Sequence, residues 1–462
     1  MPGPIFLHMM LSGQRIHPGC FSIPPGKGGA GDRLLMKKPS FVFSSRQWTV
    51  IASCFIILGL GSSLNFNFGI FIKPLLDEFS WSRSAISAGF SIFMLAGSGS
   101  AILAGWLADR YGARYVVFGG TFLIVGAMYF ASRLQNILEF YLLVGAVTGL
   151  GRSAFNTPVI AYIQRSFTRN RGLATGLAGA GGGLGILLTA PLIGYFITSF
   201  GWRLSYMAIG AVVLALAIPA VLLLRPMTES ESGGGAVGPR HREVAPLPEA
   251  AQGMSQIVRR RSFWTVLGSH TTDCMCHSIL LVHIVPFAIE SGIPRFQAAM
   301  LMSALGAGAL LGRLFCGVLS DRIGPKKALF SALIIQTLPI PLLLFSPTLP
   351  VLYLVTSLAG LGIGGHGTMY PLVTREFYGP KRVGLLVGTF TSGASVGMAA
   401  GGFLGGVLYD LAGNYTLAFV FSFAIGVVSL FLVWIYPDRK FLPAGAAGAA
   451  GVAQTKLAGE TT

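Results

Sequence analysis

Four titratable side chains lie in one apolar stretch of the chain, residues 263–289. His270, Asp273 and His277 are spaced by three and four residues, so on a helix they share one face. Burial disfavours the charged form of a carboxylic acid, and an imidazole titrates near neutral pH. We therefore expect Asp273 and His277 to couple a proton, and His283 to donate to a substrate oxygen. Histidines hydrogen-bonded between helices remain the alternative.

Two arginines also lie inside apolar stretches, Arg152 within 138–163 and Arg313 within 296–319. A guanidinium in a bilayer costs at least about 2.5 kcal/mol, so it needs a cavity, a partner or an anion. Its planar fork binds a carboxylate at two points. No acidic residue lies within one turn of Arg313, so we expect a substrate carboxylate as its counter-ion. A bridge to another helix or snorkelling is the alternative.

Arg152 is expected to be a second substrate contact, and a structural or gating pair, for example with Asp273, is its alternative. Further polar and aromatic side chains are expected around the same cavity, with ordinary packing as the alternative for each: Asn67, Phe68, Phe155, Asn156, Tyr370 and Phe390. An aromatic wall with few donors suits a small organic acid with an apolar tail.

The elements that position these residues are membrane helices. The chain is 53% hydrophobic and 11% charged, with a mean hydropathy of +0.69, which leaves too little polar surface for a water-soluble protein of 462 residues. With spans of about 20 residues, the expected helices are 48–70, 84–108, 114–133, 138–163, 172–198, 203–224, 263–289, 296–319, 328–346, 350–374, 384–409 and 415–436.

A repeated loop divides these twelve helices into two sets of six. GWLADRYGARY at 105–115 returns as GVLSDRIGPKK at 317–327, and Asp109 and Asp321 are separated by 321 − 109 = 212 residues. The pattern predicts an all-α membrane protein with two pseudo-symmetric six-helix bundles. We expect the loop charges to brace one bundle against the other as a gate, with solubilising loop charges as the alternative: Asp109, Arg110, Arg114, Asp321 and Arg322.

The sequence between and outside the bundles is of low complexity. We expect a disordered basic leader at 1–45, in which Met36 is an alternative start, bundles at 46–224 and 263–437, a cytoplasmic linker at 225–262, and a disordered tail at 438–462. Four of the five cysteines lie in apolar segments and predict small buried side chains, with no metal site.

The formal charge of +17 comes mostly from Lys and Arg in alternate short loops. The excess of cations in short loops marks the cytoplasmic side, so we expect an inner-membrane protein with both termini inside. Without a basic soluble domain, nucleic acid is excluded as a partner. We expect a monomer in the lipid bilayer.

The two D-R-x-G loops, the six-plus-six helices and the long central loop resemble the major facilitator superfamily. NFGIFIKPLLDEFSWSRSAIS, RSFTRNRGLATGLAGAGGGLG and LVHIVPFAIESGI further resemble bacterial monocarboxylate-transporter-like proteins and the oxalate/formate antiporter group. The resemblance implies that an Arg in the eighth helix, here Arg313, pairs with the substrate carboxylate. Animal members have an Asp where this chain has Ala309, and oxalate antiporters have a Lys in the eleventh helix, where 384–409 has no cation.

These observations predict a secondary active transporter that moves a small organic monocarboxylate with a proton by rocker-switch alternating access. An organic anion exchanger of the oxalate/formate type is the alternative, and drug/proton efflux is disfavoured by the two intramembrane arginines. No nucleophile, metal cluster or cofactor motif indicates an enzyme, and no cofactor is expected.

Overall fold

Long helices make up the protein because a backbone in lipid has to satisfy its hydrogen bonds within its own segment. The computed structural model describes residues 43–167, 171–225, 254–345, 347–378 and 383–436, except for the side chains at 164–165, 171–173, 254–255, 321 and 383–385. These described residues contain no strand, which confirms the all-α prediction. The predicted C-terminal tail, nearly all of the leader including Met36, and residues 226–253 of the linker lie outside the described ranges.

Apart from the interval between Leu223 and Met254, the described helices are separated along the chain only by short segments. In order they are α2 Ser45–Phe66, η1 Phe68–Phe71, α3 Ile72–Phe79, α4 Arg83–Tyr111, α5 Ala113–Ala131, α6 Ile137–Phe140, η2 Tyr141–Val147, α7 Thr148–Ser166, α8 Arg171–Leu223, α9 Met254–Val258, α10 Arg261–Glu290, α11 Arg295–Ile323, α12 Pro325–Thr337, α13 Leu342–Phe345, α14 Leu349–Tyr378, α15 Val383–Ala412 and α16 Thr416–Trp434.

Eleven described stretches are long and apolar enough to cross a membrane. One of them, within α8, contains two helices, because Gly201 has a φ of 80° and breaks the helical path. The twelve predicted spans are therefore present, and α9 lies at the end of the predicted linker.

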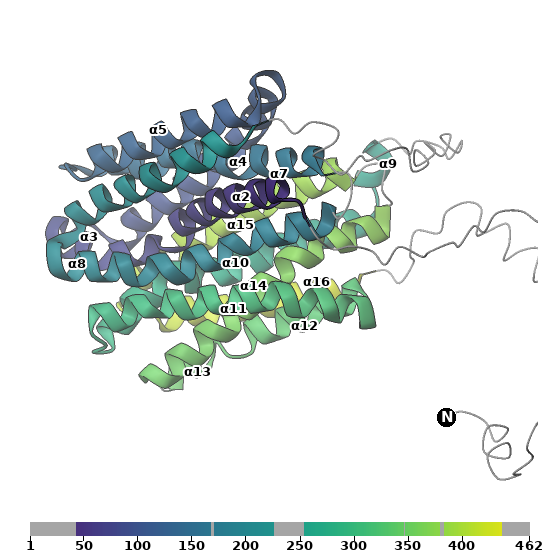
Figure 1. Cartoon of the computed structure of the whole chain (residues 1–462). Coiled ribbons are helices and arrows are strands. Elements are labelled where there is room, and N and C mark those ends of the chain that lie inside the picture. Colours follow the sequence, from purple (N-terminus) through teal and green to yellow (C-terminus); the bar gives the residue numbers. More distant parts are fainter. Residues whose placement is uncertain (1–42, 168–170, 226–253, 346, 379–382, 437–462) are drawn as a thin grey trace, which may run out of the picture. The chain divides into compact units, whose positions relative to one another are not determined.

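The long helices pack side by side in the unit that begins at Phe43 (Figure 1). In the first half of the chain α2 packs on α8 and α4 on α7. In the second half α10 packs on α15 and α11 on α14. Contacts between α8 and α11, and between α4 and α15, join the two halves.

The turns show that the duplication extends to the backbone. Positive φ angles occur at six described residues, which form three pairs: Ser80 with Gly292, Gly112 with Gly324, and Gly201 with Gly413. Each pair is separated by the same number of residues, since 292 − 80, 324 − 112 and 413 − 201 all equal 212. Glycine adopts this conformation at little steric cost, which explains five of the six positions. The two halves therefore have their loops in one common register.

Glycines also let neighbouring helices approach closely. A Cβ on Gly181 of α8 would lie 2.1 Å from the carbonyl oxygen of Phe55 in α2, and one on Gly364 of α14 would lie 2.0 Å from that of Ala309 in α11. Small residues allow such backbone contact in membranes, where hydrophobic contrast does not hold helices together. The pairs α2–α8 and α11–α14 depend on these glycines.

We predict that Gly181→Ala lowers thermal stability, because α2 has to move to accommodate the methyl group, at a cost of about 1–3 kcal/mol. Gly176→Ala in the same helix is the matched control, since a Cβ there has open space around it. Fluorescence-detected size-exclusion chromatography after heating measures both. Equal melting temperatures for the two variants would contradict the close-packing account.

Candidate transport site

A buried polar cluster surrounds Asp273 in the second half. The Nε2 of Gln336 in α12 donates to Asp273 Oδ1 at 2.6 Å, and His366 Nδ1 in α14 lies 3.1 Å from Asp273 Oδ2. Asp273 and His366 are 1% and 4% exposed. A carboxyl group enclosed in this way needs polar neighbours, because an isolated buried charge is costly.

Histidine and tyrosine rings extend the cluster along α10 and α14. The ring of His277 stacks on that of His366 with centroids 5.2 Å apart, and His270 stacks on Tyr370 at 3.8 Å. Tyr370 in turn donates its hydroxyl to Ser269 at 3.4 Å. The Nδ1 atoms of His270 and His277 have no hydrogen-bond partner among the described residues. The structure thus brings His270, Asp273 and His277, which share one face of α10, into one cluster with Tyr370 of α14.

Two members of the cluster, Gln336 and His366, are absent from the sequence-based site. Each is a polar side chain inside an apolar segment, in ALIIQT and GIGGHG respectively. Such residues are expensive in a membrane and usually face a partner. The sequence therefore marks Gln336 and His366 as candidate site residues, although it does not show that Asp273 is their partner.

The cluster also contains donors that suit a transition metal. Ligand atoms of Asp273, Cys274, His277 and His366 lie within 4.8 Å of one another. Gln336 donates to Asp273 Oδ1, whereas Asp273 Oδ2, His366 Nδ1 and His277 Nδ1 have no hydrogen-bond partner among the described residues. These atoms are chemically able to hold either a proton or a metal ion.

Arg313 lies where α11 of the second half meets α8 of the first. Its Nη1 donates to the carbonyl oxygen of Gly179. A Cβ on Gly182 would lie 3.0 Å from Arg313 Nη1 and 2.8 Å from Ser62 Oγ, so the guanidinium rests on the glycine run of α8. No described carboxylate forms an ion pair with Arg313.

Arg152 lies within the first half between α7 and α4. Its guanidinium is 5.5 Å from the ring centre of Phe93, and its Nη1 would be 3.5 Å from a Cβ on Gly97. Among the described residues no ion pair joins Arg152 to Asp273, so the structure does not support that alternative. The two arginines thus occupy different surroundings.

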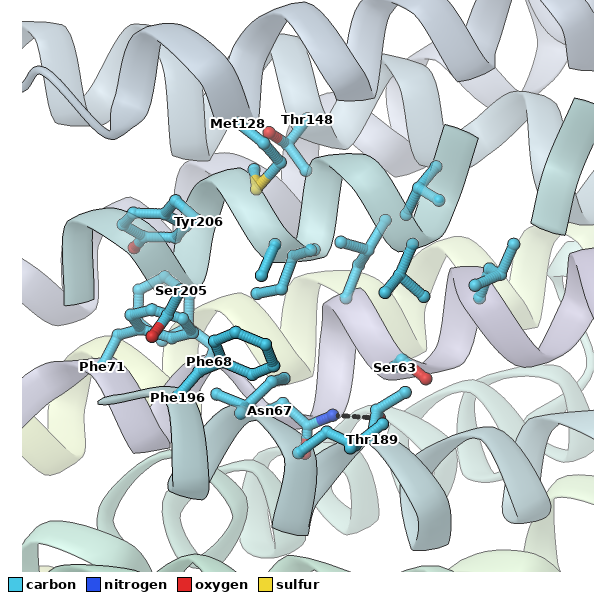
Figure 2. Close-up of a pocket in the computed structure, with 18 of the residues that line it drawn as sticks. Ser63, Asn67, Phe68, Phe71, Met128, Thr148, Thr189, Phe196, Ser205 and Tyr206 are labelled. Atoms are coloured by element: carbon cyan, nitrogen blue, oxygen red, sulfur yellow. Dashed lines mark hydrogen bonds between the residues drawn. The ribbon is translucent and has the colours of Figure 1, made fainter. Parts of the chain in front are cut away.

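Asn67 and Phe68 line a cavity of about 170 Å³ inside the first half (Figure 2). Asn67 Nδ2 donates to Thr189 Oγ1 at 2.7 Å, and Asn67 Oδ1 has no hydrogen-bond partner in the described part of the chain. Neither Arg313 nor Arg152 lines this cavity. Asn67 and Phe68 are therefore separated from the arginine expected to bind the substrate.

The remaining predicted contacts lie apart from one another. His283 Nε2 lies 2.9 Å from the carbonyl oxygen of Gly402, with its ring 5.6 Å from that of Tyr415. Phe155 is fully buried against Gly61, and Asn156 is exposed. Phe390 packs on Phe263 and Tyr378 in an apolar cluster that also contains Tyr370.

Ion pairs join the two halves at the end of the bundle where α4 begins, which we call the Arg83 end. The buried side chain of Arg83 pairs with Glu290 at the end of α10 and lies 3.9 Å from the ring centre of Tyr409. The carboxylate of Asp410 accepts the backbone N–H groups of Arg83 and Ser84 at 3.2 and 2.9 Å, which caps α4.

A second ion pair follows the duplication. Arg295 is the repeat equivalent of Arg83, since 295 − 83 = 212, and it pairs with Asp77 at 2.6 Å. Glu78, the equivalent of Glu290, pairs with Arg203 in its own half. Partial burial acts to raise the pKa of Glu78, yet hydrogen bonds from Arg203 and Trp202 lower it overall. Each half therefore contributes one arginine to the contact with the other.

The D-R-x-G loops lie at the opposite end of the helices. Arg110 extends over the rings of Trp106 and Tyr111, both at 5.6 Å, and Arg322 is exposed. Arg114 is partly buried, Asp109 is exposed and interacts with a neighbouring group, and the side chain of Asp321 is outside the described part. Towards this end, Gly176 and Gly388 have open space where a Cβ would lie. Helices of the two halves approach each other most closely nearer the Arg83 end.

The two duplicated helix bundles, with buried charges between them, define a multi-pass membrane transporter and not an enzyme. The chain matches the family model of the Major Facilitator Superfamily over residues 51–299 and 271–458, and it belongs to that superfamily.

Curated relatives of this chain are transporters. Mouse monocarboxylate transporter 11 is 29% identical over 353 residues, 76% of this chain and 71% of that protein. Monocarboxylate transporter 2 of Mesocricetus auratus is 26% identical over 397 residues, 83% of this chain and 82% of that protein. A crystal structure of a bacterial homologue of the human lysosomal transporter Spinster, in an inward-facing and occupied conformation, has a TM-score of 0.69 at 15% identity and covers 87% of this chain and 100% of its own. This last likeness supports the fold.

We predict that Glu290→Gln lowers the free energy of unfolding by about 2–3 kcal/mol, because it leaves the buried Arg83 without its ion pair. Asp77→Asn is the matched control at the same end. Its partner Arg295 has a side chain that is 46% exposed, so the loss is at most about 1 kcal/mol. Thermal unfolding of the purified variants measures both, and a larger loss for Asp77→Asn would contradict the ranking.

Proposed function

We propose that the protein moves a small organic monocarboxylate together with a proton. The observation that supports this most is Arg313, a guanidinium between the two halves without an ion pair to any described carboxylate. A fixed cation in a low-dielectric interior attracts an anion, and the guanidinium fork binds a carboxylate at two points. The likeness to monocarboxylate transporters 11 and 2 favours the same substrate class.

The proton is assigned to Asp273 and His366, with His277 stacked beside them. The nearest carboxyl oxygen and imidazole nitrogen are 3.1 Å apart without an aligned hydrogen bond, so a small rotation of either group would bring them into position to share a proton. Arg313 and His366 lie on the neighbouring helices α11 and α14, so a bound carboxylate that offsets the Arg313 charge would make a second positive charge nearby less costly. Substrate and proton would then bind cooperatively.

The contacts between the halves at the two ends of the bundle suggest how access to the site would alternate. The Arg83–Glu290 and Arg295–Asp77 pairs hold the halves together at the Arg83 end in this conformation. If the cation-rich D-R-x-G loops face the cytoplasm, as their charge favours, the Arg83 end that is held closed here faces outwards. In the outward-open state the D-R-x-G loops would form the closing contacts instead. Rocking the halves exchanges one set of contacts for the other.

Arg313→Lys tests the carboxylate site. We expect folded protein that has lost most uptake of its monocarboxylate, since a Lys cannot reproduce the two-point contact. Purified wild-type protein should be thermally stabilised by a monocarboxylate, and the variant should not be. Arg295→Lys, in an exposed ion pair, is the control. Wild-type uptake by Arg313→Lys would refute the assignment and direct attention to Arg152.

Asp273→Asn tests the proton site. We expect this variant to exchange labelled for unlabelled substrate across proteoliposomes but to lose accumulation driven by a pH gradient, because the amide cannot release a proton. His366→Gln should weaken the same accumulation. Thr272→Ala in the same helix is the control, because the Thr272 hydroxyl donates to carbonyl oxygens of its own helix. Undiminished pH-driven accumulation by Asp273→Asn would exclude Asp273 as the proton carrier.

A further inference from the structure

The cavity inside the first half is not part of the site around Arg313. It lies between α2, α5, η2, α7 and the two helices of α8, with a volume of about 170 Å³ (Figure 2). All its lining residues belong to the first half of the chain, from Leu60 to Val213. Its occupant can therefore be considered apart from the transported substrate.

The interior of this cavity is apolar although hydroxyl groups line it. Four of them donate to carbonyl oxygens of their own segments: Ser63 to Gly59 at 2.9 Å, Thr148 to Leu143 at 2.7 Å, Thr189 to Gly185 at 2.7 Å and Ser205 to Gly201 at 2.8 Å. Their protons are therefore unavailable to a ligand. The other polar groups of the lining are the Tyr206 hydroxyl and the side-chain amide of Asn67, whose Oδ1 has no hydrogen-bond partner among the described residues. The rest of the wall is aromatic and aliphatic, including Phe68, Phe71, Phe196 and Leu60.

The cavity is too large to be an ordinary packing defect. An apolar cavity of about 150 Å³ in a soluble protein stays dry and binds benzene or xenon. A cavity of 170 Å³ with so few free polar groups should likewise exclude water and accept an apolar group. The surroundings of its opening decide which apolar group can reach it.

The two exposed residues of the cavity lining lie on the two helices of α8, from which we infer that the cavity opens between these helices. Leu192 on one helix is 51% exposed and Val212 on the other is 36% exposed, whereas Ile193 and Val213 beside them are buried. Both exposed residues lie within a membrane-spanning segment, so the mouth faces hydrocarbon and not water. Lipid acyl chains are the apolar groups present there.

We propose that the end of a phospholipid acyl chain enters between the two helices of α8 and fills this cavity. The chain would restore the dispersion contacts that an empty cavity lacks. It would also support the segment of α8 at Thr189, which holds Asn67 of α2. The inference depends on the membrane location and not on the identity of the substrate.

Photolabelling with a phosphatidylcholine that has a diazirine at the end of one acyl chain tests the proposal in proteoliposomes. We expect adducts on Leu192 and Val212 to exceed those on Leu188 and Leu216, which are 54% and 46% exposed but do not line the cavity. Equal labelling of all four positions would overturn the proposal, and this comparison needs no variant.

Ala208→Phe provides the second test, because Ala208 lines the cavity and a phenyl ring would occupy it. We expect this variant to lose the excess labelling of Leu192 and Val212. Ala211→Phe, an exposed position on the same helix outside the cavity, is the matched control and should retain it. Excess labelling that persists in Ala208→Phe would show that the chain binds elsewhere.

Discussion

The guanidinium of Arg313 is a permanent charge in a protein whose solvent is largely hydrocarbon, and the proposed mechanism depends on how that charge is compensated. Gly179 provides one carbonyl acceptor, and no described carboxylate provides an opposite charge. Arg313 lies between α8 and α11, two of the helices through which the halves meet. Compensation by a substrate carboxylate would therefore act on the same contact that has to rearrange during transport.

The duplication explains how the halves can separate at one end and remain joined at the other. The three pairs of positive-φ residues show that equivalent loops occupy equivalent positions in the two halves. Arg83 and Arg295 are equivalent, yet the first is buried and the second exposed, because their acidic partners differ. Repeated sequence thus produced two unequal ion pairs, one strong and one weak, which together hold the Arg83 end.

Much of the fold was predictable, because hydropathy, loop length and the repeated D-R-x-G segment each depend on local sequence. The shared face of Asp273 and His277 was predictable for the same reason. The partners Gln336 and His366 were not, since they come from other helices whose rotation depends on packing. Arg83 and Glu290 were also missed, although Glu78–Arg83 and Glu290–Arg295 repeat at a separation of 212 and contained a readable signal. Asn67 and Phe68 were expected around the substrate cavity, and they line a cavity of the first half to which Arg313 does not contribute, which only packing reveals.

The central claim is that carboxylate and proton move together through a site formed by Arg313 and the Asp273 cluster. The most direct measurement is the internal pH of proteoliposomes containing the wild-type protein when a monocarboxylate is added outside at equal pH. We predict acidification of the interior that follows substrate entry and is absent in protein-free vesicles. Substrate exchange without any change of internal pH would contradict proton coupling and identify an anion exchanger.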